Sequence, residues 1–234
     1  METLNLIQRV LLWAVPVMFA VTVHEVAHGL AASGLGDSTA RRLRRLTLNP
    51  LRHIDPLGSL IVPGVFLLVG GFIFGWARAV PVTVENLRHP RRDMVLVAAA
   101  GPLANLLMSL FWAGCMRLGL WLLVQQPVAG SVLVYLGAAG VFINTAIMML
   151  NLLPLPPLDG GRVLAGLLPG RSGRWLASIE PWGFPILLVI ILAGMAGKLI
   201  WPMMVVGMAA ATWVTGVPVD LLTNALWGLL GGGA

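Results

Sequence analysis

Long apolar stretches dominate the chain, and short breaks rich in glycine, proline or polar residues separate them. About 20 mostly apolar residues are enough to cross the hydrocarbon core of a bilayer as a helix. The pattern therefore predicts membrane spans at about 4–34, 94–123, 132–152, 184–197 and 202–214, with an interfacial piece after the last. We expect an all-α polytopic membrane protein with about five transmembrane helices, within a range of four to six.

One further apolar stretch, from Leu57 to Trp76, is long enough to span but has an unusual composition. It contains five glycines and Pro63, and arginines flank it on both sides. A true crossing would place one arginine cluster on the opposite side of the membrane from the other. We therefore expect a re-entrant or interfacial element, whose backbone must be covered by protein. Val80–Val84 follows and is interpreted as a short strand or extended edge.

Composition agrees with a membrane protein and excludes several other classes. The 234 residues are 58% hydrophobic and only 10% charged, whereas soluble domains carry about 25% charged residues. The apolar content excludes a disordered chain. The single cysteine, Cys115, excludes a disulfide scaffold.

The net charge of +6 comes from 15 basic residues, and twelve of them lie in three clusters between the apolar stretches. Loops rich in arginine stay on the cytoplasmic side, so we place the clusters inside and the amino terminus outside. Arg9, Arg117 and Lys198 then fall on the outer side. Nucleic-acid binding would need basic residues interleaved with exposed aromatic residues on a polar face, and no such face is visible. The clusters are Arg41, Arg42, Arg44, Arg45 and Arg52; Arg78, Arg88, Arg91 and Arg92; and Arg162, Arg171 and Arg174.

Near its far end, the first span contains the sequence His24-Glu25-Val26-Ala27-His28. Residues four apart share one face of a helix, so both imidazoles can bind one Zn²⁺ while Glu25 lies beside them as a candidate base. With four histidines and four glutamates in the chain, such a pattern arises by chance in roughly one sequence in a thousand. Two buried structural histidines would leave Glu25 as an unexplained carboxylate in hydrocarbon, where ionisable residues are usually functional.

A catalytic zinc ion needs a third protein ligand and an open position for water. Four of the candidates lie in basic or polar loops, where a solvated side chain is the simpler explanation. Asp159 instead follows an apolar span and a proline-rich break that disfavours helix. Gly160 and Gly161 permit a tight turn directly after it, which could direct the carboxylate back into the bundle. A short apolar helix to Leu168 follows, so Asp159 could alternatively cap that helix. The four loop candidates are His53, Asp55, His89 and Glu180.

Three motifs together resemble the site-2 protease family of intramembrane zinc metalloproteases. They are HEVAH in the first span, AGPLAN at Ala100–Asn105 and NLLPLPPLDGGR at Asn151–Arg162; the glycine-rich segment 68–82 is similar to that of short bacterial-type members. The resemblance covers residues from 23 to about 168. It implies that His24, His28 and Asp159 bind one Zn²⁺ per chain and that Glu25 is the general base. It also implies that Asn151 helps to hold the substrate or the oxyanion.

These observations lead to one expected function. We expect a zinc metalloendopeptidase that hydrolyses peptide bonds in or near transmembrane helices of membrane-protein substrates, using a zinc-activated water and a glutamate base. It would be a single membrane-embedded domain over 1–234, with a catalytic core at about 4–168 and additional helices at 169–234, and without a PDZ or CBS domain. We expect it in a bacterial-type plasma membrane, with the lipid bilayer and substrate helices as partners, no nucleic acid, and the active site toward the cytoplasm.

Two alternatives remain open. A transmembrane metal-ion transporter also places His, Glu and Asp in spans, but it would need ligands repeated through the membrane depth. A pseudoprotease that binds helices without cutting them would not need Glu25. Haem ligation by both histidines is excluded, because two imidazoles one turn apart on a helix cannot reach opposite faces of one haem.

Overall fold

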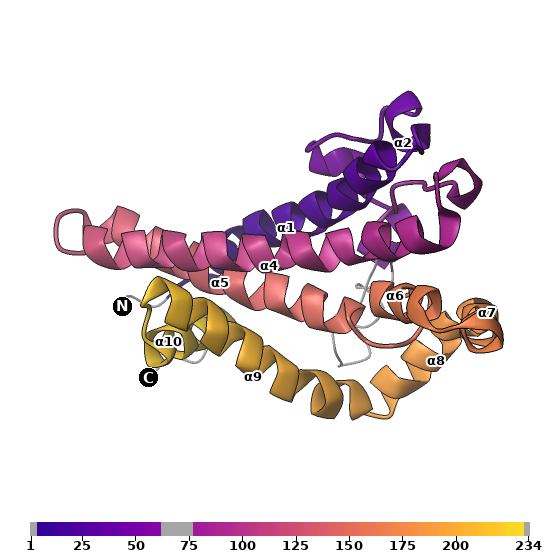
Figure 1. The fold of residues 1–234 in the computed structure, drawn as a ribbon. Helices are drawn as coiled ribbons and strands as arrows, with labels where there is room; N and C mark the ends of the chain where they lie inside the picture. Colours follow the sequence, from indigo (N-terminus) through magenta and orange to yellow (C-terminus); the bar gives the residue numbers. More distant parts are fainter. Residues whose placement is uncertain (1–3, 62–76, 232–234) are drawn as a thin grey trace.

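The computed structural model describes residues 4–61 and 77–231, and over these residues the chain is helical with no strand. Figure 1 shows the long helices lying along one another, with the short helices α2, α6 and α7 gathered at one end. The elements are α1 (Leu6–Gly34), α2 (Thr39–Arg42), η1 (Pro50–Arg52), η2 (Pro56–Ile61), η3 (Val84–Asn86), α4 (Pro90–Leu122), α5 (Pro127–Asn151), α6 (Asp159–Leu167), α7 (Gly170–Ser178), α8 (Glu180–Leu192), α9 (Met195–Thr215) and α10 (Val219–Leu230).

Four of these helices are long and apolar enough to cross a membrane: α1, α4, α5 and most of α9. A fifth crossing is obtained if α7 and α8, which are bent by 62° at their junction, count as one broken span. The expected all-α membrane architecture with four to six spans is therefore confirmed.

One expected span is wrong in its bounds. The run 184–197 does not form a single helix, because α8 ends at Leu192 and the left-handed Gly194 (φ 67°) separates it from α9. At 1.5 Å per residue, the 13 residues of α8 cover about 20 Å, which is shorter than the hydrocarbon core. The break also moves Lys198 to the beginning of α9, whereas Arg117 binds the Gly216 carbonyl at the other end of that helix. Lys198 therefore does not share a side with Arg117.

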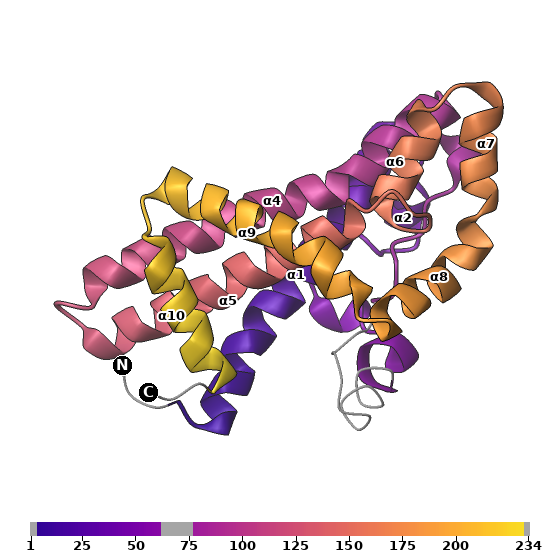
Figure 2. The same ribbon diagram turned by 90° about the horizontal axis from the view of Figure 1, so that it is seen from below.

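The helices α4 and α5 form the centre of the bundle, and α1 and α9 pack against both of them (Figures 1 and 2). Small residues let α4 and α5 approach closely. A Cβ atom at Gly140 would lie 2.1 Å from the Trp112 ring, and one at Gly137 would lie 2.6 Å from Met116 Cβ. Association between membrane helices depends on such close packing, because lipid supplies no hydrophobic driving force.

The first helix begins and ends where the sequence indicates. Asn5 caps it through a capping box with Gln8, and it ends at Gly34, before the left-handed Gly36 (φ 118°). Asp37 is then fully buried and accepts hydrogen bonds from Thr39, Asn86 and the Thr83 amide. Burial alone would raise the pKa of Asp37, but these bonds outweigh it and lower the pKa to about 2. Asp37 thus ties the end of α1 to the segment before α4.

The region between α1 and α4 was expected to contain a re-entrant element and a short strand or extended edge. Most of the run 57–76 lies outside the described residues. The segment 77–83 is non-helical and forms no strand in the described structure, so the extended edge rather than the strand is observed. Val80 and Leu87 in this region are buried.

Candidate metal centre

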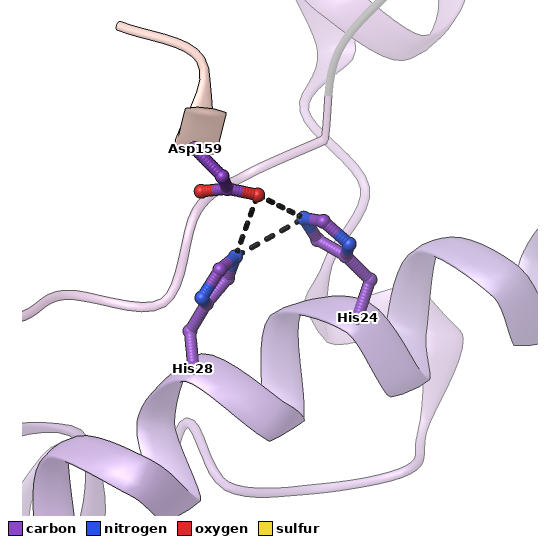
Figure 3. A group of neighbouring side chains, drawn as sticks. All are labelled: His24, His28 and Asp159. Atoms are coloured by element: carbon purple, nitrogen blue, oxygen red, sulfur yellow. Dashed lines mark hydrogen bonds and ion pairs between the residues drawn. The ribbon is translucent and has the colours of Figure 1, made fainter. Parts of the chain in front are cut away.

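The two histidines of the HEVAH motif lie one turn apart on α1 and face the interior of the bundle. Their rings meet edge to face, with centroids 4.6 Å apart and an interplanar angle of 89°. The two Nε2 atoms are 3.1 Å apart. The i,i+4 spacing predicted this shared face, and Figure 3 shows both rings pointing away from the helix toward Asp159.

Asp159 reaches the histidines from the beginning of α6, on a segment far from α1 in the sequence. Its Oδ2 atom lies 3.3 Å from Nε2 of His24 and 3.3 Å from Nε2 of His28. The two residues after Asp159 pack so closely against the preceding proline-rich segment that only glycine fits there. A Cβ at Gly161 would lie 2.1 Å from the Pro156 nitrogen, and one at Gly160 would lie 2.3 Å from the Leu152 carbonyl oxygen. The carboxylate therefore points into the bundle as expected from the sequence. The two glycines, however, lie in the first turn of α6 and permit this close packing, and do not form the tight turn that was expected.

The other end of α6 is held by Arg91 at the start of α4. Its Nε donates to the Gly166 carbonyl at 3.0 Å, and its guanidinium also donates to the Leu168 carbonyl. A cation at the carboxyl end of a helix satisfies carbonyl groups that have no partner within the helix. This contact fixes α6, and with it Asp159, relative to α4.

The hydrogen bonds behind the two rings indicate which nitrogen atoms carry protons. His28 Nδ1 lies 2.7 Å from the Val97 carbonyl oxygen, which can only accept. His24 Nδ1 lies 2.6 Å from Asn105 Oδ1. Both Nδ1 atoms are therefore assigned as donors, which leaves both Nε2 lone pairs directed at Asp159 in the neutral imidazoles.

Three electron-pair donors thus converge with no proton between them, an arrangement that fits a cation. Asp159 Oδ2 is buried and has no hydrogen-bond donor among the described residues. Zinc–ligand bonds of about 2.0–2.2 Å at tetrahedral angles place neighbouring ligand atoms about 3.3–3.5 Å apart. The separations of 3.1, 3.3 and 3.3 Å agree with this spacing to within a few tenths of an ångström. Two imidazole nitrogens and a carboxylate are also a donor set that suits zinc.

Glu25 lies between the two histidines in the sequence and is half-buried. Its Oε2 accepts a hydrogen bond from the Val80 amide at 2.8 Å, so the extended segment 77–83 passes directly beside the site. Glu25 also interacts electrostatically with His28. A base at Glu25 and an extended edge at Val80 were both expected from the sequence, but the bond between them was not.

The amide of Asn151 donates to the Ile147 carbonyl of its own helix at 3.0 Å. The other four candidate zinc ligands do not belong to the group of His24, His28 and Asp159. His53 Nε2 contacts the Thr47 carbonyl, and Glu180 pairs with Arg162 at 2.6 Å. His89 is exposed at the start of α4, while Asp55 accepts from the Gly58 amide. In the described part of the chain, His24, His28 and Asp159 form the group of side chains able to hold a metal ion.

Two asparagines at the centre were missed as site residues. Asn105 and Asn144 are fully buried and lie on α4 and α5, behind His24. Asn105 is the last residue of the AGPLAN motif, which was noticed without a role. Asn144 is an amide within the expected span 132–152, and a polar side chain at membrane depth is the signal that could have identified it.

Comparison with known proteins gives three kinds of finding. A family model described as Peptidase family M50 matches residues 119–194, which include Asp159. A Bacillus subtilis protein named "Putative zinc metalloprotease YwhC" is 34% identical over 201 residues, covering 82% of this chain and 85% of that protein. No solved structure gives a significant match.

Two mycobacterial proteins, both named "Putative zinc metalloprotease Rip2", are also similar. The Mycolicibacterium smegmatis protein is 31% identical over 175 residues, and the Mycobacterium tuberculosis H37Rv protein is 32% identical over 177 residues. Each alignment covers 75% of this chain and 64% of the relative.

Proposed function

The chain belongs to peptidase family M50, the site-2 protease family of membrane-embedded zinc metalloproteases, and from that membership we propose that it hydrolyses peptide bonds in or near transmembrane helices of membrane proteins. The observation that carries the proposal is the convergence of His24, His28 and Asp159, which leaves two imidazole lone pairs and a carboxylate oxygen about one ligand spacing apart. These three residues would hold one Zn²⁺.

Glu25 is the proposed general base. Bound zinc supplies Lewis acidity, which lowers the pKa of water toward about 7 and polarises a carbonyl oxygen. The Glu25 carboxylate accepts the proton of the attacking water and delivers it to the leaving amide nitrogen. The Val80 N–H bound to Oε2 holds this carboxylate in one orientation and leaves Oε1 available for the proton.

The substrate must be locally unwound before it can react, because the carbonyl groups of a membrane helix are already hydrogen-bonded. The segment 77–83 runs extended beside Glu25 and could pair with an unwound substrate as an added strand. Asn151 lies on the last turn of α5, eight residues before Asp159. To hold the substrate or the oxyanion, its amide would exchange the Ile147 carbonyl for that partner.

The orientation follows from the charge distribution. Arginines of the three clusters lie on or near α2, the start of α4 and α6–α7, which gather at one end of the bundle (Figure 1). We assign this end to the cytoplasm, because loops rich in arginine stay inside. The centre then lies toward the cytoplasmic side, within a single membrane-embedded protease domain whose core is at about 4–168.

Cleavage of a labelled single-span substrate in detergent tests the base. Glu25→Gln should lower the rate by about 10²–10⁴-fold, because an amide cannot take the proton, while its zinc content stays that of wild type. Glu85→Gln, an exposed change in η3, is the matched control and should cut normally. Normal cleavage by zinc-loaded Glu25→Gln would exclude Glu25 as the base.

Metal analysis tests the ligand set separately. Asp159→Ala removes one of the three proposed protein ligands. It should lose zinc, because the affinity of a metal site depends on the number of its ligands. Retention of one zinc ion per chain by Asp159→Ala would show that another residue is the third ligand.

A further inference from the structure

A chain of buried side-chain hydrogen bonds runs behind His24 into the centre of the bundle. Asn105 on α4 and Asn144 on α5 have no exposed surface. Polar side chains at membrane depth are costly unless they are paired. Asn105 contacts Nδ1 of His24, on the far side of the ring from the Nε2 atom that would bind zinc, and Asn144 contacts Asn105. The proposed mechanism therefore does not account for them.

The orientation of the Asn105 amide follows from its neighbours. Its Nδ2 donates to the Ala20 carbonyl at 3.2 Å and to Asn144 Oδ1 at 3.0 Å. The reversed amide would place its oxygen against the Ala20 carbonyl oxygen, which cannot donate. Asn105 Oδ1 must therefore face His24 Nδ1, at 2.6 Å.

Asn144 is fixed in the same way. Its Nδ2 donates to the Gly140 carbonyl at 2.9 Å, one turn earlier on α5, which leaves Oδ1 directed at Asn105. The chain of donors and acceptors thus begins at one backbone carbonyl, passes through both amides and ends on His24. Each step has only one orientation that avoids two acceptors facing each other.

We propose that Asn105 and Asn144 are positioning residues for the metal centre, which hold His24 as the Nδ1–H tautomer with its Nε2 lone pair free to bind zinc. The inference rests on the proposed role of His24 as a zinc ligand. The hydrogen-bond partner of a ligand histidine fixes its tautomer and ring orientation, and loss of such a partner typically weakens metal binding about 10–100-fold. His28 is held differently: its Nδ1 donates to the backbone carbonyl of Val97. A side-chain substitution cannot remove a backbone carbonyl, so this bond cannot be tested in the same way.

The bundle offers a matched control one turn further along α4. Ser109 is buried, and its Oγ lies 3.2 Å from Thr145 Oγ1 on α5. Ser109→Ala therefore removes a buried α4–α5 polar contact without touching His24. A general loss of packing between these helices would affect Ser109→Ala and Asn105→Leu alike.

The test measures zinc affinity of the full chain in detergent micelles by competition with a chelator. Asn105→Leu should bind zinc about 10–100-fold more weakly than wild type, while Ser109→Ala stays within about threefold. Affinity of Asn105→Leu within about threefold of wild type, or an equal loss in Ser109→Ala, overturns the inference. If Asn105→Leu does not fold, Asn144→Leu, which removes the Oδ1 acceptor of Asn105, takes its place. It should bind zinc more weakly than Ser109→Ala, and an affinity equal to that of Ser109→Ala would overturn the inference.

Nitrogen-15 NMR of the histidines in metal-free protein supplies a second readout, at about pH 8, above the ordinary histidine pKa of about 6.5. Wild type and Ser109→Ala should show His24 as the Nδ1–H tautomer, and Asn105→Leu should show a mixture; an unchanged tautomer in Asn105→Leu overturns the inference. His24→Ala separates the two levels of the argument. If it loses zinc while Asn105→Leu retains it, only the positioning role fails. If it retains zinc, the ligand assignment itself is wrong.

Discussion

Gly101 on α4 packs directly against the two histidine rings, and replacing it with alanine gives a sharp prediction. A Cβ atom there would lie 2.4 Å from His28 Nε2 and 2.5 Å from His24 Cε1. Ordinary contacts of a Cβ atom lie at 3.4–4 Å, so the two rings must retreat by about 1 Å. Functional metal sites tolerate changes of only about 0.2 Å in their metal–ligand distances.

We therefore expect Gly101→Ala to weaken zinc binding about 10–100-fold and to slow cleavage at saturating zinc by about 10²-fold, as a misplacement of about 1 Å can do. The fold should survive. Replacing glycine in a helix interior with alanine stabilises by up to about 1 kcal/mol, and overpacking costs about 1–3 kcal/mol. The metal-free protein should thus lose only about 0–2 kcal/mol of unfolding free energy.

Gly114→Ala is the matched control. Gly114 lies on the same helix, and a Cβ atom there meets nothing within 4 Å. This variant should bind zinc and cut like wild type. The assays are chelator competition, cleavage of a single-span substrate and thermal unfolding without metal. If Gly101→Ala matches Gly114→Ala in zinc affinity and in rate, the close packing of α4 against the histidines does not shape the site.

Three further predictions concern residues around the centre. Val80→Pro removes the N–H that holds Glu25; cleavage should slow about 10-fold or more while the zinc content is unchanged, and an unaltered rate would contradict the role of this bond. Asp37 has a folded pKa of about 2 against 3.8 for the free side chain, so its stabilising effect is complete above about pH 4 and is lost as the pH falls toward 2. Asp37→Asn should lower the unfolding free energy at pH 7 by about 2 kcal/mol, and its metal-free melting temperature should depend less on pH than that of wild type between about pH 4 and 2. Glu180→Gln breaks the half-exposed ion pair with Arg162, so it should cost less than about 1 kcal/mol and leave zinc binding unchanged; loss of zinc would make Glu180 a ligand.

The parts of the site that could be predicted from sequence are those set by local geometry. The i,i+4 spacing of His24 and His28 determines a shared face on any α-helix. The prolines before Asp159 likewise restrict the backbone enough to predict a break in the helix there, whereas the tight turn expected at Gly160 and Gly161 is wrong, because both residues lie in α6. The helical membrane architecture follows from the length of the apolar runs alone.

The parts that could not be predicted depend on how separate helices pack. The bond between His24 and Asn105 requires α4 to approach α1 at Gly101, and its extension to Asn144 requires α5 to lie beside α4. The bond between Glu25 and Val80 similarly joins two segments that hydropathy treats independently. The break at Gly194 was missed because the residues on both sides are apolar, so hydropathy continues through it.

The three proposed ligands come from distant parts of the chain, His24 and His28 from α1 and Asp159 from α6, while Arg91 already joins α6 to α4. A metal ion bound by all three would close a ring of α1, α4 and α6 and act as a cross-link between distant parts of the chain. Ligands that bind only the folded state add stability in proportion to the logarithm of their concentration, about 1.4 kcal/mol for each tenfold rise above the dissociation constant. The supply of zinc would therefore set the folding stability of the protein in the membrane as well as its proposed activity.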